Sequence, residues 1–238
     1  MKIGALVPVR LSSQRMPGKA LMPIMGRPAI LHLLDRLFAS KHLELQNVVL
    51  CTTTDSSDDP LVPVAESLGA RVFRGSRDNI IDRFHAAVAE FAFDAVIQAD
   101  GDDPCSDTTY MDLCMDRLLA EPELDIVLTE GVPLGLGSKA IRASAIRRVW
   151  SHHLTQQNDT GFIYFFTRTG LCKTARIRPQ KPEHITRKGP PYPGLSRRSG
   201  VFRSSVQGTL QAGNSIRDRR NCFVIASSTR TDCIEFDG

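Results

Sequence analysis

Several common features are missing from this 238-residue chain, and each absence excludes a class of protein. No run of 18 apolar residues exists, so no segment is expected to span a membrane. The first residues, "MKIGALVPVR", reach proline and arginine too early for a signal peptide, which makes a cytoplasmic location the expectation. The six cysteines form no CxxC pair and no cluster with histidine, so neither structural zinc nor a disulfide framework is expected.

The charge of the chain is divided unevenly. The formal net charge is +4, but residues 187–238 carry nine Lys and Arg against four Asp and Glu, so residues 1–186 are slightly acidic. This balance, and the lack of a surface motif that combines basic and aromatic residues, argue against a nucleic-acid partner. With 42% apolar and 24% charged residues, the chain is otherwise typical of a globular protein with a substantial core.

Strand patterns and helix patterns alternate along the first 150 residues. Apolar runs predict strands over 2–9, 47–53, 71–75, 93–100 and 124–130. Apolar residues at helical spacing predict helices over 28–40, 58–70, 78–91 (with Asp78 as its N-cap), 106–120 and 138–150. This alternation predicts an α/β fold with a mostly parallel sheet and helices on both faces. Ligands bind such sheets at the carboxyl ends of the strands.

A basic segment, "VPVRLSSQRMPGKAL", follows the first predicted strand. It carries three permanent cations, Arg10, Arg15 and Lys19, and Gly18 lets the backbone approach a ligand closely. Guanidinium and ammonium groups bind phosphate oxygens, so the segment predicts a polyphosphate site; a solvated basic turn is the alternative. It lacks the first glycine and the last hydroxyl of a P-loop, and the near-dinucleotide motif "GLGSKA" lies too far from its strand.

An acidic segment, "QADGDDP", ends the strand predicted over 93–100. Asp100, Asp102 and Asp103 crowd together there, and Gly101 permits a sharp turn. Crowded carboxylates repel one another unless a cation neutralises them. Mg²⁺ accepts one or two carboxylates and completes its shell with water and phosphate oxygens. The segment therefore predicts a Mg²⁺ site opposite the basic segment, with an aspartate-capped turn as the alternative.

These two segments, together with "GRPAI", "TTDSSDD" and "VFRGSRDNIIDRF", resemble the sugar cytidylyltransferases over roughly residues 1–186. The nearest branch is the group of spore coat polysaccharide biosynthesis protein F, akin to the 3-deoxy-manno-octulosonate and acylneuraminate cytidylyltransferases. The resemblance implies a GT-A-like (Rossmann-like) nucleotidyltransferase domain over 1–186. It also implies the reaction of CTP with a sugar acid to give a CMP-sugar and pyrophosphate in surface polysaccharide biosynthesis. Mg²⁺ is the implied cofactor and a homodimer the implied assembly.

The resemblance also implies roles for individual residues. The catalytic residues would be Arg10, Lys19 and Asp102. The metal ligands would be Asp102 and Asp103. The nucleotide contacts would be Pro8, Val9, Arg10, Ser13, Arg15, Lys19, Arg74, Ser76 and Asp100. Asp82 and Arg83 match a segment at the nucleotide side, or else form a solvated pair on a helix, and His85, His152 and His153 are expected at the surface.

The C-terminal part departs from the family's pattern. Such enzymes generally take a second metal ligand from a late "LDTPEDL"-like segment, and "PYPGLSRRSGVF" stands in its place. Codons for residues 194–202 can be chosen so that the next reading frame spells "DSPEDLEFF". Because the codons are chosen to suit, a frameshift near residues 184–190 is a hypothesis. It predicts that residues 187–238, where only 222–227 read as a strand, are a disordered or frameshifted tail, and that the chain binds CTP weakly and turns over poorly.

Other functions stay open from the sequence. One is a different nucleotidyltransferase of the same fold, acting on guanylyl or other NTP-sugar substrates. Another is a catalytically dead nucleotide-binding remnant. Lys139 stands where relatives often carry an acidic residue, so the sugar is not assigned.

Overall fold

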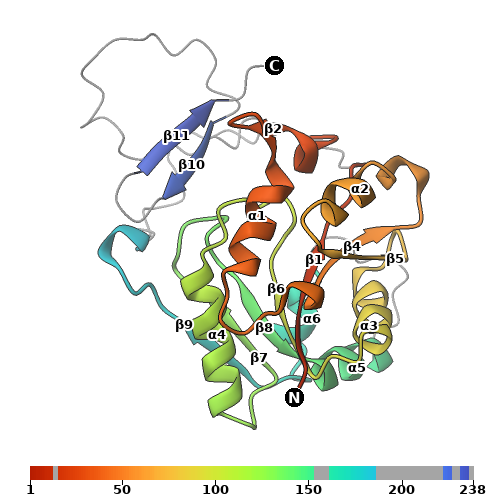
Figure 1. The fold of residues 1–238 in the computed structure, drawn as a ribbon. Helices are drawn as coiled ribbons and strands as arrows, with labels where there is room; N and C mark the ends of the chain where they lie inside the picture. The colour runs from red at the N-terminus through yellow and green to blue at the C-terminus, as the bar shows by residue number, and fades with distance from the viewer. Residues whose placement is uncertain (13–15, 153–160, 186–221, 227–230, 236–238) are drawn as a thin grey trace, which may run out of the picture. The chain divides into compact units, whose positions relative to one another are not determined.

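A computed structural model describes residues 1–12, 16–152, 161–185, 222–226 and 231–235 (Figure 1). The chain divides into two compact units, Met1–Thr186 and Arg187–Gly238. The frameshift hypothesis concerns residues that lie almost wholly outside the described parts. In the second unit, β10 (Cys222–Ala226) pairs antiparallel with β11 (Thr231–Glu235). The strand expected over 222–227 corresponds to β10, and β11 was not predicted.

The first unit is built on a seven-stranded sheet with the order β5-β4-β1-β6-β8-β7-β9. The strands are β1 (Ile3–Pro8), β4 (Val48–Thr53), β5 (Arg71–Gly75), β6 (Ala95–Gln98), β7 (Ile126–Thr129), β8 (Lys139–Arg142) and β9 (Thr174–Ile177). β1 pairs in parallel with both β4 and β6, and β4 pairs in parallel with β5. β8 runs antiparallel between β6 and β7. The mostly parallel sheet is the predicted one, and it sets the carboxyl ends of β1, β4, β5 and β6 along a single edge.

Helices cover both faces of this sheet (Figure 1). They are α1 (Ala29–Phe38), α2 (Leu61–Glu66), α3 (Ile80–Glu90), α4 (Thr108–Ala120), α5 (Ala143–His152) and α6 (Ile163–Thr167). Buried residues of α1, α2 and α4 pack in one apolar cluster, and those of α3, α5 and α6 in a second. No helix in the described parts combines the length and apolar character needed to cross a bilayer.

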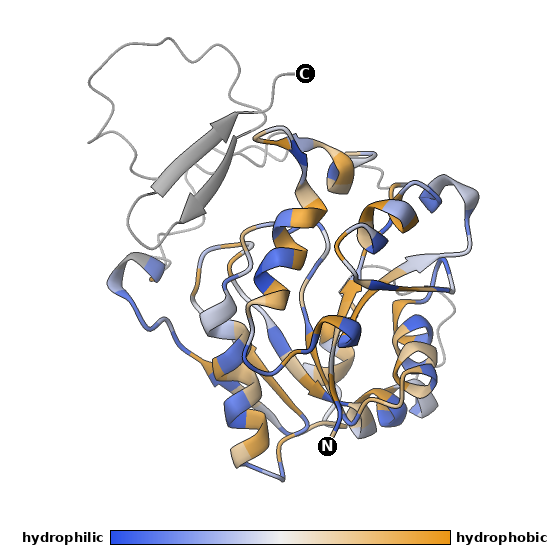
Figure 2. Cartoon of the chain, viewed as in Figure 1, coloured by the Kyte–Doolittle hydropathy of each residue, from blue (hydrophilic) through white to orange (hydrophobic). Residues whose placement is uncertain are grey.

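The central strands β1, β4 and β6 are mainly apolar and buried, as expected for strands that are covered on both faces. Along β6, Ala95 and Ile97 belong to one cluster and Val96 to the other, as the period of two in a strand requires. Figure 2 shows apolar residues along the central strands, whereas the helices carry polar residues on one side and apolar residues on the other. The core therefore lies in two layers, one on each side of the sheet.

Short elements connect the main ones. The single-turn 3-10 helices are η1 (Lys19–Leu21), η2 (Leu45–Asn47), η3 (Ser56–Asp58) and η4 (Pro182–His184). β2 (Pro23–Ile24) and β3 (Arg27–Pro28) form a small hairpin before α1. Two of these, η1 and η3, follow the carboxyl ends of strands and so lie where ligands bind in such folds.

Two expectations from the sequence are corrected. The helix expected over 138–150 is instead β8 followed directly by α5, because Ala140 and Ile141 are buried on opposite faces of the sheet. A short apolar run does not distinguish a strand from the start of a helix by its period. The N-cap of α3 is Asn79, whose side chain accepts the Asp82 N–H, and not Asp78. The strand β9 was not predicted from the sequence.

Candidate active site

The basic and acidic segments leave the carboxyl ends of two neighbouring strands and contact each other there. β1 and β6 are parallel neighbours, so their following loops start side by side. The Gly101 N–H donates to the Pro8 carbonyl at 3.0 Å. A Cβ on Gly101 would lie 2.6 Å from the Val9 Cβ, so this close approach requires glycine. The two loops therefore begin as one joined unit, with Arg10 and Asp102 at the same edge of the sheet.

Opposite charges of the two loops meet at Lys19 and Asp102. Gly18 adopts φ 71°, the left-handed conformation that favours glycine, and Lys19 then begins η1. The Lys19 Nζ lies 3.4 Å from the Asp102 Oδ2, and the two side chains are 24% and 53% exposed. Ion pairs with this exposure add little to stability. The ion pair can therefore break at little cost, and each group can then bind an opposite charge on a ligand.

Asp100 is held by a different cation. Lys139 of β8 donates to its Oδ2 at 3.1 Å, and the Gln98 side-chain amide donates to its Oδ1 at 2.8 Å. Burial raises the pKa of Asp100, but the charge of Lys139 and these hydrogen bonds outweigh burial and hold the pKa below its usual value. Asp100 is therefore ionised, and the positive charge of Lys139 balances its negative charge. Its predicted contact with the nucleotide stays a prediction.

Asp103, unlike Asp100, lies where ionisation of its carboxyl group is unfavourable. Burial raises the pKa of Asp103 to about 7, and the nearby charges of Asp102 and Asp100 add to this, although Lys19 and Lys139 act in the opposite direction. The site therefore disfavours three ionised carboxylates together, and a bound cation would relieve the repulsion.

The donors of this loop suit Mg²⁺ bound together with a phosphate ligand. In the parts of the chain that the structure describes, no group of three or more His, Cys, Asp or Glu is placed to hold a metal ion. Asp102 and Asp103 offer two carboxylates, and Mg²⁺ usually takes one or two from a protein and the rest from water and phosphates. The metal ligands stay a prediction that this chemistry supports.

The start of the basic loop is fixed by its neighbours. The Val9 N–H donates to the Cys51 carbonyl at 3.2 Å, and the Leu11 N–H donates to Asp58 at 2.7 Å. Arg10, which lies between them, is partly exposed. Asp58 was not predictable from the sequence, because three aspartates occur in "TTDSSDDP" and nothing in their spacing singles it out. Of the remaining predicted residues, Ser13 and Arg15 lie outside the described residues.

Arg74 and Ser76 lie at the same edge, but on the far side of β4 from β1. Arg74 donates to the carbonyls of Thr53 and Asp55, both at 2.8 Å, and pairs with Asp59 at 2.6 Å. The Ser76 hydroxyl accepts an N–H from the turn before α3. Arg74 thus braces the loop after β4, and Ser76 braces the turn between β5 and α3. Their nucleotide contacts stay predictions.

Arg83 is not part of a solvated pair, which was one of its two interpretations. It is 3% exposed and donates to the carbonyls of Ser76 at 3.1 Å and Cys51 at 3.0 Å. Its guanidinium group therefore links β4 to the segment that follows β5. His85 is partly exposed and stacks on Trp150 at a centroid distance of 3.9 Å.

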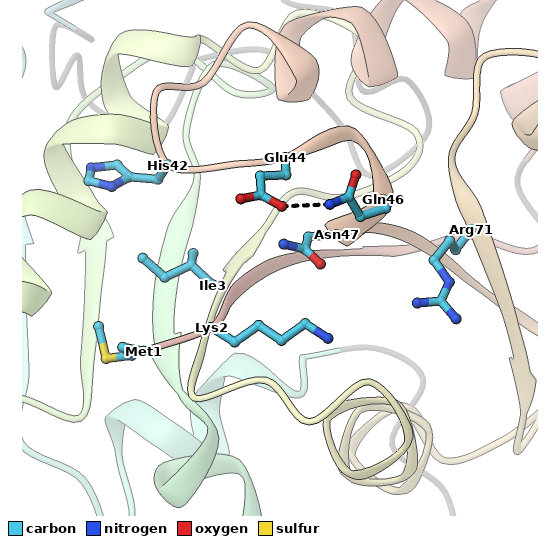
Figure 3. Close-up of a pocket in the computed structure, with 8 residues that line it drawn as sticks. All are labelled: Met1, Lys2, Ile3, His42, Glu44, Gln46, Asn47 and Arg71. Atoms are coloured by element: carbon cyan, nitrogen blue, oxygen red, sulfur yellow. Dashed lines mark hydrogen bonds between the residues drawn. The ribbon is translucent and has the colours of Figure 1, made fainter.

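A pocket of about 510 Å³ lies at the opposite edge of the sheet (Figure 3). Its walls are Met1, Lys2, Ile3, His42, Glu44, Gln46, Asn47 and Arg71, which surround the amino ends of β1, β4 and β5. Its charges are held locally: Lys2 donates to the Phe91 carbonyl at 2.8 Å, and Gln46 donates to Glu44 at 2.6 Å. None of the predicted site residues lines it, so the carboxyl edge is the candidate active site.

A family comparison identifies the chain. The model of the cytidylyltransferase family matches residues 4–184. The chain belongs to the cytidylyltransferase family. It is thus a nucleotidyltransferase by family, which confirms the resemblance seen in the sequence.

Curated relatives of this cytidylyltransferase include proteins of three kinds. An uncharacterized protein of Methanocaldococcus jannaschii is 30% identical over 79% of this chain and 76% of its own length. Spore coat polysaccharide biosynthesis protein SpsF of Bacillus subtilis is 28% identical over 59% of each chain. The 8-amino-3,8-dideoxy-manno-octulosonate cytidylyltransferase of Shewanella frigidimarina is 37% identical over 45% of this chain and 43% of its own. The match thus spans about half the length of the last two relatives.

Solved structures agree with this assignment. A cytidylyltransferase from Leptospira borgpetersenii superposes with a TM-score of 0.69 at 25% identity, over 76% of this chain and 77% of that one. CMP:2-keto-3-deoxy-manno-octonic acid synthetase, solved with CTP, superposes with a TM-score of 0.60 over 75% of this chain and 91% of that one. At 16% identity the second likeness concerns the fold alone. Together they confirm the Rossmann-like nucleotidyltransferase fold.

Proposed function

We propose that this cytidylyltransferase transfers a cytidylyl group from CTP to a sugar acid, giving a CMP-sugar and pyrophosphate. The contact between Lys19 and Asp102 carries the proposal, because it joins a cation-bearing loop to a carboxylate-bearing loop where α/β folds bind ligands. The name of the Shewanella relative supports a sugar acid as the acceptor. The name of the Bacillus relative supports a place in surface polysaccharide biosynthesis.

The residues suit the charge changes of this reaction. A hydroxyl oxygen of the sugar acid attacks the α-phosphorus of CTP and forms a new P–O bond. The bond from the α-phosphorus to the oxygen shared with the β-phosphate breaks, pyrophosphate leaves, and the hydroxyl proton passes to solvent. Negative charge grows on the phosphate oxygens, and Arg10 and Lys19 offset it.

Lys19 and Asp102 change partners in this proposal. Lys19 exchanges the Asp102 carboxylate for a phosphate oxygen, which frees Asp102 and its neighbour Asp103 to hold Mg²⁺. The metal ion, when bound, supplies positive charge beside the phosphate oxygens. The raised pKa of Asp103 supports this role, because a cation would favour the ionised form that burial and the neighbouring carboxylates disfavour.

The nucleotide is tested first. Thermal unfolding of the full chain is measured with CTP, GTP, UTP or ATP, each with Mg²⁺. We expect the largest rise in Tm with CTP, since a ligand that binds only the folded state stabilises it. A larger rise with GTP or UTP would favour another nucleotidyltransferase of the same fold. Pyrophosphate release with CTP and a panel of sugar acids, such as 3-deoxy-manno-octulosonate and N-acetylneuraminate, then identifies the acceptor.

A second candidate is nucleotide binding without turnover. It is favoured by the missing late aspartate segment, which removes a further metal ligand that the family's pattern provides. We propose that the 238-residue chain is impaired for this reason. Replacing residues from about 190 onward by the shifted reading should restore pyrophosphate release; equal activity of both forms would contradict the impairment. CTP binding without turnover in both forms would support the second candidate.

A further inference from the structure

Asp58 is a buried carboxylate that links the end of β4 to the basic loop. It is 1% exposed and closes η3, five residues after the end of the strand. Its Oδ1 accepts the Leu11 N–H at 2.7 Å. Its Oδ2 accepts the Thr53 hydroxyl at 2.5 Å and the Thr53 N–H at 3.3 Å. This side chain thus contacts Thr53 in its own region and Leu11, which lies 47 residues before Asp58 in the chain.

Leu11, the residue that Asp58 holds, is also where the basic loop closes on itself. The Leu11 carbonyl accepts the Gly18 N–H at 3.0 Å. Arg10 directly precedes this closure and Lys19 directly follows it, and Lys19 reaches Asp102 at 3.4 Å. The contacts from Thr53 through Asp58 to the loop therefore fix the base from which both cations extend.

The negative charge of Asp58 needs an explanation beyond the stability of its own segment. A buried carboxylate is costly unless it is well hydrogen-bonded. It also places a negative charge beneath a loop that is proposed to bind a triphosphate, which on electrostatic grounds weakens that binding. Its benefit is therefore geometric. Two hydrogen bonds tie Asp58 to Thr53 at the end of β4, and a third ties it to the Leu11 N–H of the basic loop. Hydrogen bonds to a charged acceptor are stronger than neutral ones, so the start of the loop is held in place before the ligand arrives.

The neighbouring aspartates have other tasks. Asp55 accepts the Ser57 N–H at 2.9 Å and pairs with Arg77, and Asp59 pairs with Arg74. Asp58 is the member of this segment that contacts the basic loop.

We propose that Asp58 is a positioning residue for triphosphate binding: it holds Leu11 so that Arg10 and Lys19 face the ligand. This inference rests on the proposed function. Asp58 itself does not contact the ligand, and it acts through the backbone of the loop. Loss of its carboxylate should therefore free the loop and weaken CTP binding while the sheet stays folded.

The test compares Asp58→Ala and Asp58→Asn with Glu66→Gln, which removes one negative charge at the exposed end of α2. Amide hydrogen exchange at Leu11 reports the loop, and exchange at Leu50 in the middle of β4 reports the sheet. In Asp58→Ala we expect exchange at Leu11 to accelerate at least about tenfold relative to Leu50, because the amide loses its acceptor. We expect the Kd for CTP with Mg²⁺ to rise about tenfold, the usual effect of losing one charged hydrogen bond.

The conservative variant separates positioning from charge. Asp58→Asn keeps one oxygen for the Leu11 N–H, so most of the exchange protection and affinity should return, and Glu66→Gln should match the wild type. Unchanged exchange at Leu11 in Asp58→Ala, or unchanged CTP affinity despite faster exchange, would overturn the inference.

A second pair of variants serves if Asp58→Ala does not fold. Thr53→Val removes the hydroxyl donor to Asp58, and Thr53→Ser keeps it. Faster exchange at Leu11 and weaker CTP binding in Thr53→Val than in Thr53→Ser would support the inference, and equal values would overturn it. If neither the wild type nor the form with the shifted reading binds CTP, the proposed function fails, and the exchange data still decide whether Asp58 holds the loop.

Discussion

The two edges of the central sheet both gather charged side chains, but they hold them differently. At the amino edge, Arg71 lies over the Phe91 ring at 4.4 Å and Lys2 donates to the Phe91 carbonyl. At the carboxyl edge, carboxylates crowd together and the pKa of Asp103 rises to about 7. The amino edge has a pocket of about 510 Å³, whereas the carboxyl edge has the crowded carboxylates. A pKa that burial and nearby charges shift strongly is typical of functional sites.

The largest contrast between the edges is expected for the aspartates. Asp102→Asn should lower CTP- and Mg²⁺-dependent pyrophosphate release by about 100-fold or more, because it removes an anchor for charge stabilisation in the transition state. Asp116→Asn is the matched control at the amino edge, where Asp116 accepts a hydrogen bond from His42 at 2.8 Å. It should leave the rate unchanged. Equal losses in the two variants would erase the distinction between the edges.

The junction of the two loops gives the next largest effect, on stability. Gly101→Ala places a Cβ 2.6 Å from the Val9 Cβ and 2.9 Å from the Pro8 carbonyl oxygen, so the loops must move apart. We expect the free energy of unfolding in urea to fall by about 2–3 kcal/mol, as for an overpacked site. Gly170→Ala, with φ 77° and no described heavy atom within 4 Å, should cost only about 1 kcal/mol through backbone strain. Equal costs would show that the loops are not tightly joined.

The pH dependence of stability sharpens the comparison further. Folding raises the pKa of Asp103 from 3.8 to about 7, so the folded state binds the proton more tightly and the contribution of Asp103 to stability falls as the pH rises between these values. Asp103→Asn should therefore gain stability relative to the wild type from pH 5 to pH 8, by about 1–2 kcal/mol after allowance for solvent screening. Urea unfolding in a chelator checks this. A difference that does not change with pH would contradict the crowding of carboxylates.

The smallest effect is expected at the amino edge. Arg71→Met keeps the aliphatic contact but removes the cation above the Phe91 ring, which should lower the free energy of unfolding by about 0.5 kcal/mol. The Kd for CTP should not change. A marked loss of CTP affinity would move the nucleotide site to the pocket of Figure 3.

The sequence was sufficient for the parts of the fold that repeat a simple pattern. Strands such as β1 and β4 are short runs of mainly apolar residues, and helices such as α1 and α3 keep a clear period, so the sheet and the edge that carries the loops were predictable. β8 was not, because its four residues run directly into α5 without a turn signal. β9, also of four residues, lacks a distinctive pattern.

The candidate site was predictable only where chemistry and chain position agree. Lys19 and Asp102 each follow a strand, and their meeting follows from the parallel pairing of β1 and β6. The contact between Lys139 and Asp100 depends on the antiparallel register of β8, which sets Lys139 opposite Gln98. The role proposed for Asp58 depends on its tertiary contact with Leu11. No local pattern encodes either of these contacts.

A double-mutant cycle between the loops tests the central claim most directly. The Kd for CTP in the presence of Mg²⁺ is measured for the wild type, Lys19→Met, Asp102→Asn and the double variant. If the two loops bind one metal–triphosphate ligand, each single change weakens binding, and the double change weakens it less than the product of the two, with a coupling of about 1 kcal/mol or more. Effects that multiply independently, or CTP binding that does not depend on Mg²⁺, would contradict the claim.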